Sequence, residues 1–386
     1  MNRQTLDPLI DQRRVVLCVG CGGVGKTTVA AALALAAARR GKRVLCLTID
    51  PARRLANSLG LDRMTGEAQL VAPAVFEAAG LPVSGSLTVM MLDTKRTFDE
   101  LVTRHASTAE ARDRILHNRL YQYVSTSLAG TQEYMAMEKL LTVKQDARYD
   151  LIILDTPPTS NALDFLDAPE RITQAIDSAA MRWFIQAFET SGKFSLNLVA
   201  KSVALVLKGI GKLTGGGFLE QMAEFISELN DLFGGFKSRA AEVSEAFRSP
   251  EFAYVLVTSP APMAIREVLF FAERLQAQGM ARDAFVVNRV HRAPKSVATL
   301  AQAEAALKRH GITLKADGAA RLVRAVDEEQ QLADLDRSYL DRLEKGRTTS
   351  NPDGSFPARV MIPALPSDVH DISTLAGIAQ LLAPGA

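Results

Sequence analysis

The sequence predicts an α/β fold, with a doubly wound, mostly parallel sheet and an inserted helical subdomain. Short apolar runs alternate with helical patterns, and several runs, such as 151–154 and 254–257, are apolar at nearly every position. Such runs are typical of parallel strands that are covered on both faces. Two longer stretches, about 94–146 and 160–250, carry helical patterns without a convincing strand. We therefore expect residues 1–386 to form a single domain into which these two stretches insert a helical subdomain.

The individual elements follow from the apolar runs and the residues that bound them. The predicted strands cover residues 14–19, 43–49, 87–92, 150–155, 253–258, 284–288 and 359–362. Between them, the clearest helical patterns cover residues 26–40, 131–146 and 262–278. The segment 346–358 is rich in Gly, Asn, Pro and Asp, and it predicts an exposed loop.

Composition excludes two broad classes of protein. The 386 residues include 45 Lys+Arg against 43 Asp+Glu, which gives a formal net charge of +2. A nearly balanced chain has no basic surplus to neutralise many phosphates, so we expect no nucleic acid partner. The apolar content of 47% excludes disorder as the main state. The mean hydropathy of +0.05 is nevertheless high for a chain without an obvious membrane span.

The apolar residues are not gathered in one long segment. The longest uninterrupted apolar run, Val29–Ala38, is far shorter than the ~18–20 residues that cross a bilayer. The apolar residues 15–19 follow two arginines as in a signal sequence, but glycines and Lys26 interrupt the pattern at once. We therefore expect a cytoplasmic protein. Its three cysteines all precede residue 47, and an odd number argues against a disulfide framework.

Residues 20–27 fit the phosphate-binding pattern GxxxxGK[ST], between an apolar strand and an alanine-rich helix. Glycines let backbone N–H groups turn towards phosphate oxygens, and the helix N-terminus adds partial positive charge. Lys26 would reach the β- and γ-phosphates, and the Thr27 hydroxyl would hold Mg²⁺. The expected nucleotide-binding residues here are Gly22, Gly23, Val24, Gly25, Lys26, Thr27 and Thr28. The sequence therefore predicts a P-loop nucleotide site.

Two aspartates end predicted strands on the same sheet edge, where open α/β sheets bind ligands. Asp155 would hold Mg²⁺ through water. Asp50 has two interpretations on spacing alone. It could orient the water that attacks the γ-phosphate, because phosphoryl transfer depends on positioning. It could equally be a helix N-cap before Pro51.

Three motifs together resemble one family of P-loop ATPases. Residues 22–28 look like the deviant Walker A of the signal-recognition/MinD class. Residues 50–53, Asp-Pro-Ala-Arg, are similar to a switch I motif Asp-Pro-Ala-His, and residues 155–161 resemble a switch II motif Asp-Thr-Ala-Pro-Thr-Gly-His. The combination is similar to the arsenite-pump ATPase (ArsA) family, which includes the ATPases that target tail-anchored proteins. The resemblance continues through 258–262, 286–288 and 362–366, and so covers most of the chain.

The resemblance implies a set of roles and ligands. It implies ATP and Mg²⁺ as cofactors, and Lys26 and Asp50 as catalytic residues. Asp50 would activate the attacking water and, like Asp155, contact Mg²⁺ through water. Asn288 would hydrogen-bond adenine, and Pro366 would belong to the nucleotide pocket. Members work as cytoplasmic dimers with nucleotide near the interface.

The chain also departs from the family pattern. The signature lysine that reaches the partner's nucleotide is replaced here by Cys21, whose short and mostly uncharged thiol cannot supply that charge. Either hydrolysis is slow, or Arg53 or Arg54 substitutes, or the partner is a paralogous ATPase with its own lysine. A homodimer and a heterodimer therefore both stay open. This chain contains a single ATPase half, with one P-loop, and no cysteine after Cys46. We therefore expect neither an arsenite nor a zinc site.

The helical stretch 195–236 is unusually apolar. Its first helix has a narrow polar face marked by Lys201, Lys208 and Lys212, and a second helix has acidic residues opposite a wide apolar face. These helices are a buried core, or a groove for an apolar client helix, as in the tail-anchor targeting members, or a helix on a membrane surface, for which the three lysines are suitable. The main hypothesis is an ATPase with a chaperone or targeting role. The alternatives are a MinD/ParA-like positioning ATPase at a membrane and a slowly hydrolysing regulatory subunit.

Overall fold

The computed structural model describes most of the chain. The described residues are 4–49, 56, 59, 61, 64–118, 121–122, 125, 131–157, 162–177, 238–295, 299–315, 317–347, 350–351 and 354–386. The chain divides into two compact units, each described by itself below. The first unit comprises Met1–Met90, Ala147–Ala162 and Pro250–Ala386, and the second comprises Met91–Asp146 and Leu163–Ser249.

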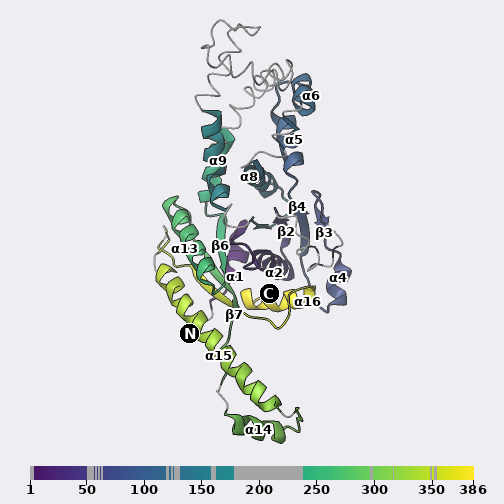
Figure 1. Cartoon of the computed structure of the whole chain (residues 1–386). Helices are drawn as coiled ribbons and strands as arrows, with labels where there is room; N and C mark the ends of the chain where they lie inside the picture. The colour runs from purple at the N-terminus through teal and green to yellow at the C-terminus, as the bar shows by residue number, and fades with distance from the viewer. Residues whose placement is uncertain are drawn as a thin grey trace, which may run out of the picture. The chain divides into compact units, whose positions relative to one another are not determined.

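An eight-stranded sheet in the order β3-β4-β2-β5-β1-β6-β7-β8 forms the centre of the first unit (Figure 1). Its strands are β1 (Val15–Val19), β2 (Arg43–Thr48), β3 (Gln69–Leu70), β4 (Ser86–Met91), β5 (Leu151–Asp155), β6 (Phe252–Thr258), β7 (Ala284–Val290) and β8 (Ala358–Pro363). Neighbouring strands are parallel along the part of the sheet with the order β2-β5-β1-β6-β7-β8, and β3 pairs antiparallel with β4. Every residue of β1, β5 and β6 is buried, so both faces of the sheet centre are covered. The predicted α/β class with a mostly parallel sheet is confirmed.

The helices of this unit account for much of the apolar content. They are α1 (Asp7–Gln12), α2 (Lys26–Arg39), α4 (Pro73–Ala78), α13 (Pro262–Ala277), α14 (Leu300–Arg309), α15 (Gly318–Arg347) and α16 (Ile372–Leu382). The apolar run Val29–Ala38 lies in α2, where each of its residues is at most 2% exposed. There α2 packs on β1, β2, β5 and α16. Small alanines allow this close approach of helix to sheet, so the run is ordinary core.

The second unit is built from helices in its described part. They are α5 (Thr94–His105), α6 (Ala109–His117), α8 (Thr131–Lys144) and α9 (Ala162–Ile176), and residues 238–248 are also helical. A buried ion pair joins α8 to the helix formed by residues 238–248. Glu138 is 1% exposed, and its carboxylate accepts from Arg239 Nε at 3.0 and 3.1 Å and from the Tyr134 hydroxyl at 2.7 Å. Burial and the neighbouring Glu138 raise the pKa of Tyr134, which keeps this hydroxyl a donor.

The structure differs from the sequence predictions in a few places. Strand β3 has only two residues, too few for a recognisable pattern, and the sequence does not predict it. The segment 346–358 is not the wholly exposed loop that its composition predicts, because α15 continues to Arg347, and Asn351 and Pro357 are buried. Asn351 is held because its Oδ1 accepts from the backbone N–H of Arg282 at 2.9 Å and its Nδ2 donates to Arg282 O at 3.0 Å.

Two predictions lie outside the described residues: the position of Asp50 with its switch I neighbours, and the apolar stretch 195–236. Within the described ranges, no helix combines the length and the apolar character that crossing a membrane requires.

Candidate functional site

The loop between β1 and α2 has the geometry of a phosphate cradle. Gly22 and Gly23 are exposed, Val24 is buried, and α2 begins at Lys26 with Gly25 as its N-cap. Gly25 has φ 95°, a left-handed conformation that favours glycine. At the start of the loop, a Cβ on Gly20 would lie 2.1 Å from the Val257 carbonyl oxygen of β6. Only glycine therefore fits where the loop leaves the sheet.

The side chain of Asn288, near the end of β7, holds this loop through a hydrogen bond. Its Nδ2 donates to the carbonyl oxygen of Val24 at 2.8 Å, and its Oδ1 accepts from the backbone N–H of Arg289 at 3.0 Å. A Cβ on Gly25 would lie 2.3 Å from the same Nδ2. Arg289 has φ 62°, unusual for a residue with a side chain, and the Asn288 side chain supports that turn. The adenine contact expected of Asn288 stays a prediction.

Lys26 lies at the first position of α2 and is 7% exposed. Its Nζ donates to the carbonyl oxygen of Cys21 at 3.0 Å, so the ammonium group lies across the loop. Residues 20–27 contain no other charged side chain. An anion that enters this loop would meet backbone N–H groups, the N-terminus of α2 and this single cation.

Thr27 and Asp155 lie in contact, as the magnesium prediction requires. Thr27 Oγ1 donates to Asp155 Oδ2 at 2.7 Å, and Asp155 is 1% exposed at the end of β5. Thr48, the last residue of β2, donates its hydroxyl to the same oxygen at 3.1 Å. The Asp155 carboxylate and the Thr27 hydroxyl are hard oxygen donors, which suit Mg²⁺, and Thr48 helps to hold that carboxylate. The residues present therefore fit this ion.

Cys21, the second residue of the phosphate loop, is a free and partly buried cysteine. Burial raises the pKa of its thiol, and the carboxylate of Glu267 on α13, which accepts a hydrogen bond from the thiol, raises it further. The neighbouring Lys26 acts in the opposite direction but is the weaker influence. The thiol is therefore protonated at neutral pH and is a poor nucleophile. It also forms a CxxC spacing with Cys18, which is fully buried in β1.

Sequence reasoning missed Thr48, Thr156 and Glu267. Thr156 ties the residue after Asp155 to β1, because its hydroxyl donates to the Cys18 carbonyl oxygen at 2.8 Å. Thr48 ends a strand on the carboxyl edge, and that position was its only sequence signal. Pro366 is exposed, and the segment that leads to it is anchored where Ala364 N donates to Val290 O at 2.9 Å. The predicted residues of the loop, Asp155 and Asn288 are thus gathered at the carboxyl ends of β1, β5 and β7.

Gly25 offers a direct test of this geometry. Gly25→Ala places a methyl group in an unfavourable φ region and against Asn288, so we expect loss of ATP binding by at least about tenfold and a lowered melting temperature. Gly41→Ala is the matched control, because Gly41 has φ 86° but nothing within 4 Å of an added Cβ. The control is expected to lose only about 1 kcal/mol of stability and to bind ATP normally. Equal ATP affinities in the two variants would contradict the assigned packing.

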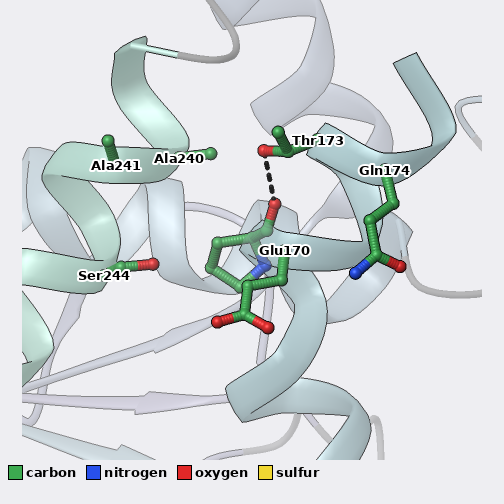
Figure 2. Close-up of a pocket in the computed structure, with 7 residues that line it drawn as sticks. Glu170, Thr173, Gln174, Ala240, Ala241 and Ser244 are labelled. Carbon is green, nitrogen blue, oxygen red and sulfur yellow. Dashed lines mark hydrogen bonds between the residues drawn. The ribbon is translucent and has the colours of Figure 1, made fainter. Parts of the chain in front are cut away.

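The second unit contains a shallow cavity of about 320 Å³. Figure 2 shows Glu170, Thr173 and Gln174 of α9 on one side and Ala240, Ala241 and Ser244 on the other. The Thr173 hydroxyl donates to the carbonyl oxygen of Pro169, one turn earlier in α9, at 2.9 Å. These residues include no cluster of metal-ligating or nucleophilic groups.

Comparison with known proteins agrees with the loop and its surroundings. A profile of the anion-transporting ATPases matches residues 13–312. ATPase GET3 of Phaeosphaeria nodorum is 25% identical over 291 residues, which cover 74% of this chain and 80% of that protein. ATPase GET3 of Paracoccidioides lutzii is 27% identical over 292 residues, covering 74% and 76%, and that of Paracoccidioides brasiliensis is 26% identical over 290 residues with the same shares. The matched region includes the whole phosphate loop, Asp155 and Asn288, so the chain belongs to the anion-transporting (ArsA) ATPase family and is an ATPase.

Proposed function

We propose that this ATPase is a Mg²⁺-dependent dimer that couples ATP hydrolysis to a change in its helical subdomain, which binds an apolar protein segment. The observation that carries the catalytic part is the contact of Thr27 with Asp155 at 2.7 Å. It brings the phosphate loop and the end of β5 together at the edge where an α/β sheet binds its ligand.

The protein groups divide the work of ATP binding. Backbone N–H groups of residues 22–27 and the N-terminus of α2 bind the phosphate oxygens, and Lys26 turns its ammonium group from the Cys21 carbonyl to the β- and γ-phosphates. Asn288 keeps Val24 and Gly25 in the conformation that points these N–H groups inward. Asp50 accepts a hydrogen bond from the attacking water and so orients it towards the γ-phosphate.

A magnesium ion at this site would lie beside Thr27 and Asp155, with Asp50 and Asp155 contacting it through water. When bound, the ion neutralises charge on the β- and γ-phosphate oxygens. Thr48 donates to the carboxylate oxygen that Thr27 also contacts, and it thereby fixes the Asp155 rotamer. The buried carboxylate is accordingly held in place before any ligand arrives.

Membership of the family supports the dimeric state and the client. The names of the relatives state an ATPase activity. The proposed client is an apolar helix that binds at 195–236, in a chaperone or targeting role. Hydrolysis would change this region through residues 155–161, which lead from Asp155 directly into α9 of the helical unit.

The decisive experiment replaces Asp50 by asparagine. Asp50→Asn keeps the size of the side chain but removes the charge that orients water, so we expect ATP turnover to fall about a hundredfold while ATP affinity changes little. Turnover is measured by phosphate release, and affinity by calorimetry. Asp93→Asn serves as control, because Asp93 caps α5 through Arg96 N at 2.9 Å and has no proposed role in hydrolysis. An Asp50→Asn protein with wild-type turnover would refute the mechanism.

A second candidate is a regulatory subunit that binds ATP but hydrolyses it slowly beside a paralogous ATPase. The contact of Cys21 with Glu267 favours it, since a neutral loop thiol beside a carboxylate of α13 lies where the family has a lysine. The two candidates differ in intrinsic turnover. A purified protein that binds ATP but accelerates only when a lysine-containing paralogue is added would favour the regulatory subunit.

A further inference from the structure

The hairpin of α14 and α15 ends in a loop with exposed apolar side chains. Ile312 is 52% exposed and Leu314 is 46% exposed, and Leu300 and Leu322 on the flanking helices are 47% and 43% exposed. Of the twelve strongly exposed large apolar side chains among the described residues, six lie on this hairpin. Figure 1 shows α14 and the first turns of α15 extending beyond the strands of the sheet. Apolar side chains gathered at one exposed end usually mark a binding surface.

Backbone hydrogen bonds fix both ends of the loop between α14 and α15. Gly311 has φ 66°, and the N–H of Ile312 donates to the Leu307 carbonyl oxygen at 2.9 Å, which closes the end of α14. The N–H of Gly318 donates to the Lys315 carbonyl oxygen at 2.7 Å at the start of α15. Leu314 lies over Gly318, where an added Cβ would come within 2.4 Å of the Leu314 Cβ. The exposed apolar side chains therefore lie on a loop whose two ends are tied to the flanking helices.

The charge of the hairpin changes along its length. Residues 299–326, which we name the hairpin tip, contain five basic side chains against two acidic ones, Glu304 and Asp317. The five are Lys308, Arg309, Lys315, Arg321 and Arg324. Residues 327–347 instead contain seven acidic side chains against four basic ones. Arg321 pairs with Asp317 at 3.3 Å, whereas the structure records no salt bridge for the other four basic groups with described residues.

We propose that the hairpin tip docks on an anionic lipid surface. Ile312 and Leu314 enter the boundary between headgroups and acyl chains, while the surrounding lysines and arginines contact lipid phosphates. A cluster of four to eight basic groups beside apolar side chains has the composition that binds anionic leaflets. The acidic half of α15 is repelled by the same surface and keeps the nucleotide-binding sheet away from it.

The shape and charge of the tip favour a membrane over two other occupants. An acidic protein segment is best held in a groove lined by basic groups, whereas here exposed basic residues precede and follow an exposed apolar loop along the chain. A second copy that meets the first tip to tip would bring two basic clusters together, which costs energy. A fluid bilayer needs no matching groove. Exposed apolar side chains between basic helix ends are therefore best matched by anionic lipid.

The experiment measures co-sedimentation of the full chain with vesicles of phosphatidylcholine containing phosphatidylglycerol, against vesicles of phosphatidylcholine alone. Binding is expected with the anionic vesicles only, and it should weaken as salt shortens the Debye length from about 10 Å towards 3 Å. Lys315→Gln with Arg324→Gln removes two charges and should lower the partition coefficient about thirtyfold. Ile312→Ser with Leu314→Ser should lower it about tenfold or more.

Leu332→Ser with Leu335→Ser is the matched control, because these side chains are 42% and 50% exposed but lie in the acidic half of α15. The control should bind vesicles as the wild type does. Equal binding to neutral and anionic vesicles, or full binding by both tip variants, would overturn the proposal, since another part of the chain would then hold the lipid. Binding of polyglutamate without binding of vesicles would assign the tip to an acidic protein partner instead.

Discussion

Lys26→Met is expected to lower kcat/KM for ATP about a thousandfold. Lys26 is the single charged side chain of the phosphate loop, residues 20–27. Its ammonium group is therefore the only cationic side chain of the loop that can stabilise the negative charge that develops on the γ-phosphate oxygens. Methionine has a similar length and is easily buried, and Lys26 is only 7% exposed. The fold should therefore persist with an unchanged or slightly raised melting temperature. ATP binding by calorimetry and turnover by phosphate release separate the two contributions.

Lys42→Met controls for the loss of one positive charge. Lys42 directly precedes β2, at the amino end of the strands, whereas the phosphate loop lies at their carboxyl end. The control should keep wild-type kcat/KM. If Lys26→Met were to hydrolyse ATP within about tenfold of the wild type, the loop would not be the phosphate site that its geometry indicates.

The sequence could predict those site residues whose chemistry is local. Residues 20–27 are consecutive, so their pattern is complete in the sequence. Asp155 is the last residue of a strand whose other residues are all apolar. The parallel strands were predictable for the same reason, because each is a short apolar run. Their observed ends differ from the predicted ones by no more than two residues.

The contacts that residues make across the fold left no such trace. Asn288 reaches the carbonyl oxygen of Val24 from 264 positions away along the chain. Glu267 lies on the helix that follows β6, and only the folded sheet brings it to Cys21. The buried Asn351 sits in a stretch whose composition indicates a loop, and its burial depends on the partner Arg282. Contacts of this kind follow from strand order, which no local pattern specifies.

Asp155→Asn is expected to reduce turnover about a thousandfold and to remove its dependence on Mg²⁺. The substitution keeps the shape of a side chain that is 1% exposed but removes the charge that a divalent cation requires. ATP affinity measured without metal should change little, because the phosphate loop is intact. The measurement is a titration of turnover with Mg²⁺, together with metal-free calorimetry.

Stability gives an independent readout for the same variant. Asp155 is 1% exposed, and neutralising a buried charge removes the cost of its desolvation, so the melting temperature should stay unchanged or rise.

Thr48→Val and Thr27→Val distinguish a metal-linked carboxylate from a merely structural one. Thr48 and Thr27 both donate to Asp155 Oδ2, at 3.1 and 2.7 Å, but only Thr27 belongs to the phosphate loop. If Asp155 acts through Mg²⁺, Thr27→Val should raise the Mg²⁺ concentration needed for half-maximal turnover, whereas Thr48→Val should change it less than about threefold. If the contact of Thr27 with Asp155 is only structural and holds no Mg²⁺, the two threonine variants should be equally damaging and neither should alter the Mg²⁺ titration. The ratio of these two effects therefore decides whether this contact is a metal site.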